Sequence, residues 1–194
     1  MPAPELDHIV LTCADLDAGT IWLSALLGVG PDGGGAHAVM ATHNRLWRLG
    51  PGEYLELIAP DPAAENPPYP RWFGLDAPPE APRLTGWACR MSPVKPPEGS
   101  RVIAAARGDL RWRIAVPDSG ISGADGLDPL RIDWGQGRHP SADMPDHGFR
   151  LIGLDLSHPK PPKLPLNDPR VKLIKAERAG MRAHISTPRG KVTL

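Results

Sequence analysis

Short apolar segments separated by proline- and glycine-rich turns constrain this chain more than any other feature. The 194 residues include 25 prolines, and these cluster between the apolar segments rather than within them. Proline removes a backbone donor and stiffens a connection, so the clusters mark loops. Apolar segments of this length, bounded by such turns, are typical of β-strands. The pattern predicts a β-rich α+β protein with one main helix.

The first block of the chain has the order strand, helix and three strands. Residues 6–13 form an apolar run, and residues 15–27 follow with apolar side chains at helical spacing, namely Ala18, Trp22, Ala25 and Leu26. Asp15 or Asp17 is suited to cap the start of this helix, and Gly28 its end. Residues 33–35 are three glycines, which predict a flexible turn before three strands within residues 36–59.

Weaker copies of this unit follow. The second block has strands at 83–91, 109–116 and 129–134, with residues 101–107 as its one helical segment, and the third block begins at Phe149. The predicted organisation is a first module at residues 1–62, a proline-rich connector at 63–82, and two strand-rich blocks at 83–194 that complete the same domain. Two such curved sheets are expected to enclose a cleft.

Charge and composition exclude several classes of partner. The chain has 22 basic and 22 acidic residues, so nothing favours binding to nucleic acid or to an anionic membrane. No apolar run approaches 18 residues, and the first residues lack a basic start with an apolar core. We therefore expect a cytoplasmic protein whose two cysteines, Cys13 and Cys89, are reduced core residues.

His8 and Glu56 are the candidate functional pair. Each lies in the middle of an apolar strand, and the helix separates them in the sequence. Burying an unpaired imidazole or carboxylate costs several kcal/mol, so something must compensate each of them. The compensating partner is a metal ion, a hydrogen bond to a substrate, or the other member of the pair.

Six short motifs together resemble a known family. They are LDHIV at 6–10, THN at 42–44, YLELIAPDP at 54–62, RWFGLD at 71–76, IDWG at 132–135 and TPRG at 187–190. In this order and spacing they resemble the glyoxalase-like domain family of the vicinal oxygen chelate superfamily, which also includes bleomycin-resistance proteins and dioxygenases. The resemblance implies paired βαβββ modules that form a curved mixed sheet with a U-shaped cleft.

The resemblance also implies a divalent metal in the cleft. His8 and Glu56 match the ligand positions of the first module, and Asp133 is the one candidate from the second, where Gly86 stands opposite His8. Imidazole and carboxylate donors suit Zn, Fe, Mn or Ni. The alternative is a His8–Glu56 hydrogen bond that lines a polar cleft without a metal.

Four further residues are candidates for the site. His43 would be a third ligand or a general base beside Glu56, or a residue that stabilises a turn. Asn44 is its neighbour in the THN motif and would bind substrate. Arg113 would bind a carboxylate or phosphate if its face of the strand points into the cleft, and would be solvated if it points outward. Trp72 would form a wall or lid of a ligand pocket.

Two functions remain open at this point. The first is a glyoxalase-like small-molecule enzyme of the lyase, isomerase or dioxygenase type, acting through His8 and Glu56. The second is a non-catalytic protein that sequesters a small hydrophobic or cationic compound in the same cleft, as resistance proteins of the superfamily do. In either case the partner is a small molecule. The sequence does not decide whether the modules pair within one chain or across a homodimer.

Overall fold

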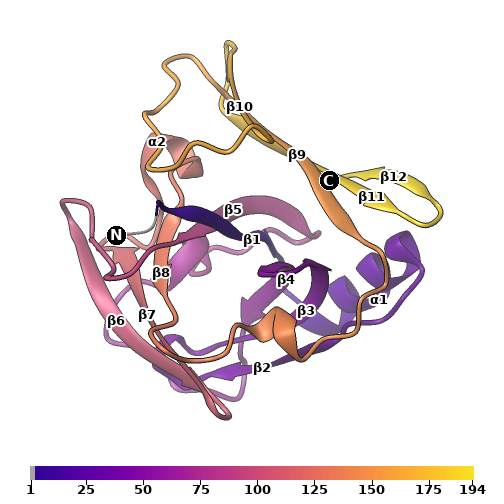
Figure 1. Cartoon of the computed structure of the whole chain (residues 1–194). Coiled ribbons are helices and arrows are strands. Elements are labelled where there is room, and N and C mark those ends of the chain that lie inside the picture. The colour runs from indigo at the N-terminus through magenta and orange to yellow at the C-terminus, as the bar shows by residue number, and fades with distance from the viewer. Residues whose placement is uncertain (1–2) are drawn as a thin grey trace.

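The computed structural model describes residues 3–194, which form two β-sheets (Figure 1). The eight-stranded sheet contains β1 (Glu5–Thr12), β2 (Gly33–His37), β3 (Thr42–Gly50), β4 (Glu53–Pro60), β5 (Arg83–Arg90), β6 (Ser100–Arg107), β7 (Leu110–Pro117) and β8 (Leu130–Asp133). The four-stranded sheet contains β9 (Arg150–His158), β10 (Val171–Lys175), β11 (Gly180–Thr187) and β12 (Gly190–Thr193). The helical segments are α1 (Leu16–Leu27), α2 (Gly123–Gly126) and the 3-10 turns η1 (Ala38–Met40), η2 (Trp72–Gly74) and η3 (Pro140–Ala142).

Two modules with the same strand order make up the larger sheet. Its order is β2-β3-β4-β1-β5-β8-β7-β6, so β1 joins the first four strands to the second four through β5. β1 is parallel to β4, β5 is parallel to β8, and β1 and β5 are antiparallel. The outermost strands β2 and β6 also contact each other, so the sheet curves until it is nearly closed (Figure 1). The predicted β-rich class with a curved mixed sheet is confirmed.

Alternation along the strands divides the apolar side chains between two cores. Inside the curved sheet, Val10 and Ile58 pack with residues of β6, β7 and β8. On its outer face, Ile9 and Leu57 pack with α1 and with Leu154 of β9. The four-stranded sheet, in the order β10-β9-β11-β12, therefore covers the outside of the larger sheet. Within residues 3–194 no helix is long and apolar enough to cross a membrane.

The predicted ends of α1 are confirmed, but the apolar residues that indicated the helix by their spacing do not form its buried face. Asp15 accepts hydrogen bonds from two backbone N–H groups of the first turn, and Gly28 ends the helix at a φ of 77°. The buried residues are Leu16, Gly19, Leu23 and Leu27. Trp22 and Leu26 are exposed. The reason is Gly19, because a Cβ there would lie 2.9 Å from Cys13 Sγ; the absent side chain lets this face pack closely on β1 and β4.

Two other local predictions are wrong. The glycines at 33–35 belong to β2, which pairs with β3, and are not a free turn. Residues 101–107 were expected to be helical but form β6, paired with β7 along its whole length. In β6 the side chains of Ile103 and Ala105 are buried while their neighbours are exposed. This alternation outweighs the helical propensity of the alanine run, because β6 must close one end of the sheet.

Candidate functional site

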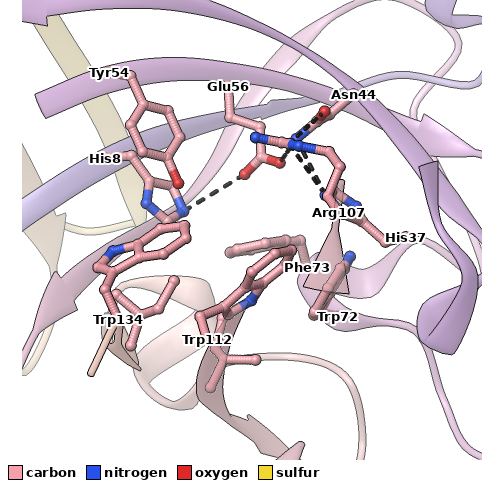
Figure 2. A pocket seen from close by; sticks show the side chains of 12 residues that line it. His8, His37, Asn44, Tyr54, Glu56, Trp72, Phe73, Arg107, Trp112 and Trp134 are labelled. Atoms are coloured by element: carbon pink, nitrogen blue, oxygen red, sulfur yellow. Dashed lines mark hydrogen bonds and ion pairs between the residues drawn. The ribbon is translucent and has the colours of Figure 1, made fainter. Parts of the chain in front are cut away.

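A pocket lies inside the curved sheet, and its empty volume is about 350 Å³, with the open mouth included. Figure 2 shows polar side chains along one side and aromatic rings along the other. The residues that line it are His8, His37, Asn44, Tyr54, Glu56, Trp72, Phe73, Arg107, Trp112, Ile114, Ile132 and Trp134. Strands β1 to β4 supply most of the polar groups, while β7, β8 and η2 supply most of the apolar ones.

A β-bulge in β1 turns two consecutive polar residues toward the interior. Leu6 pairs with Cys89 and His8 pairs with Ala88, so Asp7 is the extra residue of the first strand. In a regular strand, neighbouring side chains point to opposite faces, but a bulge re-aims one of them. As a result Asp7 lies directly behind His8, and its Oδ1 is 2.6 Å from His8 Nδ1.

Asp7 is a fully buried carboxylate with four polar side chains around it. Besides His8, it accepts a hydrogen bond from Trp134 Nε1 at 3.0 Å, and His139 Nε2 and Arg90 Nη1 lie 3.2 Å and 3.7 Å from its Oδ2. Burial by itself would raise the pKa of Asp7, but the contacts from His139 and His8 outweigh burial and hold the pKa well below its ordinary value. Asp7 is therefore ionised and fixes His8 with a proton on Nδ1.

His8 and Glu56 are brought together at the polar side of the pocket. His8 Nε2 lies 3.5 Å from Glu56 Oε2, and both side chains are nearly buried. The imidazole stacks on Tyr54, with ring centroids 4.5 Å apart and planes 12° apart. Burial and the carboxylates of Asp7 and Glu56 raise the pKa of Tyr54, so its phenol stays neutral. Because Nδ1 of His8 is bonded to Asp7, Nε2 is the ring nitrogen that faces Glu56.

Asn44 connects Glu56 to a cation at the other end of the polar side. Its Nδ2 donates to Glu56 Oε1 at 2.6 Å, and its Oδ1 accepts from Arg107 Nη1 at 2.9 Å and from the Gly35 N–H at 3.0 Å. The amide thus has a donor facing the carboxylate and an acceptor facing the guanidinium. This arrangement fixes the orientation of Asn44 and separates the two charges.

His37 completes the polar side as a neutral acceptor. Burial, reinforced by the charge of Arg107, lowers the pKa of His37 to about 3. Its Nδ1 lies 3.1 Å from Thr42 Oγ1, and its Nε2 lies 3.3 Å from Asn44 Nδ2 and 3.4 Å from Arg107 Nη1. Since the last two partners are donors, Nε2 carries the lone pair and Nδ1 the proton.

Trp72 and Phe73 of η2 close the aromatic side. Trp72 Nε1 donates to Thr42 Oγ1 at 3.2 Å, which ties η2 to the first module. Phe73 has a φ of 56°, a conformation that L-residues seldom adopt. Its ring lies over Gly86 of β5, where a Cβ would come within 2.6 Å of Phe73 Cδ1. Gly86, which the family resemblance matches to His8, therefore leaves space for the Phe73 ring in the wall of the pocket.

The structure brings together His8, Glu56, Asn44 and Trp72 of the predicted site residues, and it does not bring the others to this pocket. His43 lies between Thr42 and Asn44 in β3, so its side chain points to the opposite face from theirs. Arg113 is exposed on the outer face of β7, which is the outward orientation that the sequence analysis gave as one of two alternatives. Asp133 accepts a hydrogen bond from the Gly135 N–H at 2.9 Å, while its neighbours Ile132 and Trp134 line the pocket.

The residues present do not fit a resident divalent metal. His8 Nε2 and Glu56 Oε2 are two facing donors, but His8 Nδ1 is bonded to Asp7. Between residues 3 and 194, no group of three or more His, Cys, Asp or Glu side chains is placed to hold a metal ion. Fewer than three protein ligands seldom retain such an ion. The predicted set of His8, Glu56 and Asp133 for Zn, Fe, Mn or Ni is not assembled here.

Asp7, His37 and Arg107 are among the site residues that sequence reasoning missed. Asp7 had a signal, because it places a second polar residue next to His8 in an apolar strand. His37 and Arg107 had none that is local, since their roles depend on contacts with Asn44 across the sheet. The contact between β2 and β6 cannot be read from either segment alone.

Comparisons with known proteins agree with this architecture. A family described as "Glyoxalase-like domain" matches residues 6–166. Among solved structures, a hypothetical protein from Staphylococcus aureus is 10% identical with a TM-score of 0.56, covering 91% of this chain and 88% of that one. At such identity the likeness shows the fold alone.

Two methylmalonyl-CoA epimerase structures are also similar. One, in complex with methylmalonyl-CoA and NH4+, is 16% identical with a TM-score of 0.45, covering 72% of this chain and 100% of that one. The enzyme from Mycobacterium tuberculosis is 21% identical with a TM-score of 0.42, covering 66% and 85%. No curated protein matches the sequence. With the family match spanning most of its length, the chain belongs to the glyoxalase-like domain family.

Proposed function

We propose that this protein is a small-molecule enzyme that moves a proton on its substrate, in the isomerase or lyase class. Glu56 is the general base and His8 its proton partner. The observation that carries the proposal is the line of contacts from Asp7 through His8 to Glu56, with distances of 2.6 Å and 3.5 Å, at the polar side of a pocket whose opposite side is aromatic. Buried acid–base pairs of this kind are typical of proton-transfer sites.

The chemistry follows from where the protons are. Glu56 takes a proton from a carbon next to a carbonyl, and the electrons of the C–H bond move onto the carbonyl oxygen to give an enolate. The proton returns to the same or a neighbouring carbon in an isomerase, or a leaving group departs from the β-carbon in a lyase. Asp7 keeps the proton on His8 Nδ1, so that Nε2 exchanges a proton with Glu56.

The remaining residues of the pocket hold the substrate and exclude water. Trp72, Trp112 and Trp134 present aromatic surface opposite Glu56 (Figure 2), which suits a planar, apolar body. Proton transfer in this arrangement requires no metal. An oxygenase reaction would need a redox centre that the donor set does not provide, so a dioxygenase is not part of the proposal.

A solvent-exchange experiment tests the proposed reaction. Phenylpyruvate, 2-oxobutyrate and pyruvate are incubated with the protein in D2O, and the loss of the C3 proton signal is followed by NMR. We expect exchange of at least one compound above the buffer rate in the wild type, at least about 100-fold slower exchange in Glu56→Gln, and no change in Glu65→Gln, an exposed control.

The same aromatic surface favours one second candidate, a non-catalytic protein that sequesters a small apolar compound. Quenching of tryptophan fluorescence separates the two candidates, because three of the rings that line the pocket are tryptophans. Saturable quenching by phenylpyruvate, with exchange at the buffer rate for all three compounds, would establish binding without catalysis and contradict the enzyme proposal.

A further inference from the structure

Arg107 presents an unpaired charge to the pocket. Its Nη1 donates to Asn44 Oδ1 at 2.9 Å, and the side chain is half-buried at the end of β6. Among residues 3–194, no carboxylate lies within 4 Å of its guanidinium, and its Nε and Nη2 have no hydrogen-bond partner in the protein. An arginine is charged at every physiological pH, and leaving such a charge half-buried without an anion is unfavourable.

The position of Arg107 is built into two strands of the first module. The aliphatic part of its side chain lies against Gly35 of β2, where a Cβ would come within 2.8 Å of Arg107 Cδ and 3.1 Å of Cγ. At the tip, neutral His37 and the carbonyl oxygen of Asn44 accept from Nη1. One edge of the guanidinium is thus fixed by the protein, while Nε and Nη2 stay free.

We propose that Arg107 is the residue that selects anionic substrates, and that the pocket takes small planar carboxylates with an aromatic or similarly flat body. This rests on the proposed function, since it names the substrate class of the same site. The free Nε and Nη2 form a fork that matches the two oxygens of a carboxylate. Asn44 separates Arg107 from Glu56, so a carboxylate held at Arg107 directs the adjoining carbons toward the base.

The charge and the aromatic lining of the site favour a carboxylate over two other ligands. Trp72, Phe73, Trp112 and Trp134 line the pocket beside Arg107 and suit a flat apolar body that carries a negative charge. A cationic compound would be repelled by the charge of Arg107. This argues against sequestration of a cationic compound, one of the two ligand types considered in the sequence analysis. A phosphate ester presents the same kind of negative charge in a tetrahedral form, and the test below distinguishes it.

Binding of compounds that do not react tests this assignment. Phenylacetate, phenylacetamide, phenyl phosphate and phenethylamine are titrated by calorimetry and by tryptophan fluorescence. We expect phenylacetate to bind at least about 10-fold more tightly than its neutral amide, and Arg107→Gln to raise the phenylacetate Kd by at least about 10-fold while changing the amide Kd by less than about 2-fold. Arg107→Lys should restore part of the difference.

The matched control is Arg113→Gln, which removes the same charge from the outer face of the neighbouring strand. Equal affinity of the wild type for phenylacetate and phenylacetamide would overturn the assignment, as would an equal loss of phenylacetate affinity in both arginine variants. Preference for phenyl phosphate over phenylacetate would overturn the carboxylate class. Thermal unfolding checks that Arg107→Gln remains folded, and Arg107→Lys provides a second reading with the charge retained.

The two proposals fail separately. Phenylacetate binding requires no proton transfer, so Arg107-dependent binding without deuterium exchange of any α-keto acid would contradict the proposed enzyme and leave the carboxylate site intact. Exchange that persists at the wild-type rate in Arg107→Gln, at substrate concentrations below saturation, would contradict the role of Arg107 and leave the acid–base pair intact.

Discussion

The two modules of the eight-stranded sheet share a strand order but supply opposite chemistry to one pocket. The first module, strands β1 to β4, provides Asp7, His8, Asn44 and Glu56. The second module, β5 to β8, provides Trp112, Ile114 and Ile132, followed by Trp134, and its single charge in the pocket is Arg107. One half is therefore suited to proton transfer and the other to holding a flat substrate.

The difference is clearest at the positions where a symmetrical pair of modules would repeat a ligand. At the position that the family resemblance matches to His8, the second module has Gly86, which pairs with Val10, and the ring of Phe73 occupies the space above it. Near the end of β8, the carboxylate of Asp133 faces away while Ile132 and Trp134 face the pocket. The repeated fold thus provides a nearly closed sheet around an open-mouthed pocket, and the side chains of each half decide the chemistry of that pocket.

The largest effect is expected from the carboxylate behind His8. Asp7→Asn should lower the free energy of unfolding by about 3 kcal/mol, because it removes a buried charge that holds His8, His139 and Trp134 together. Urea denaturation measures this change. Asp109→Asn, an exposed substitution in the second module, should change it by less than about 0.5 kcal/mol. A loss below about 1 kcal/mol in Asp7→Asn would show that the contact network does not support the first module.

An intermediate effect should separate binding from chemistry. Trp112→Leu should raise the phenylacetate Kd about 5-fold, because an aromatic contact in the pocket is lost. It should leave the deuterium exchange rate at saturating substrate within about 2-fold of the wild type. Glu56→Gln should instead slow the exchange strongly and leave the phenylacetate Kd within about 2-fold of the wild type. If the exchange rate at saturation falls as strongly in Trp112→Leu as in Glu56→Gln, the assignment of proton transfer to the first module and substrate binding to the second is wrong.

The sequence predicted the polar half of the site far better than the aromatic half. His8 and Glu56 were recognisable because polar residues in the middle of apolar strands need a partner. Asn44 came from a motif of the family, and Trp72 from being an aromatic residue in a proline-rich loop. Aromatic residues such as Trp112, by contrast, look like ordinary core in a sequence, since an alternating strand has the same pattern whether its inner face meets packed side chains or a pocket.

The features that were not predicted depend on geometry beyond a single strand. Asp7 faces inward because of a bulge that appears only when β1 is paired with β5. Arg107 reaches the pocket because β6 is a strand and because Gly35 of β2 leaves space for it. The buried face of α1 was not predicted because Gly19 allows a close approach that hydrophobic spacing does not register. Each of these is a contact between segments distant in the sequence.

The pH dependence of stability offers a smaller test of the first module. The folded protein keeps His37 neutral with a pKa of about 3, whereas an unfolded chain takes up that proton near pH 6.5. Acidification therefore favours the unfolded state, and the stability lost grows as pH falls from 6.5 toward 3. Between pH 6.5 and 5.5 the wild type should lose about 1 kcal/mol more than His37→Gln. Urea denaturation at the two pH values measures this difference. If the wild type and His37→Gln lose the same free energy of unfolding between them, His37 takes up a proton in the folded state.

The smallest effect is expected at the buried strands β1 and β5, where the two modules are joined. Cys13 follows β1 and Cys89 lies in β5, the two strands that join the modules, and both thiols are buried. Burial raises the pKa of Cys13 to about 11 and that of Cys89 to about 12. At pH 8 the thiolate fraction is then on the order of 0.1% or less, and thiolate is the reactive form. Ellman's reagent should leave the native protein unlabelled over an hour and label two thiols per chain in urea. Rapid labelling of one thiol in the native protein would mean that the joint between the modules opens, which the continuous pairing of β1 with β5 opposes.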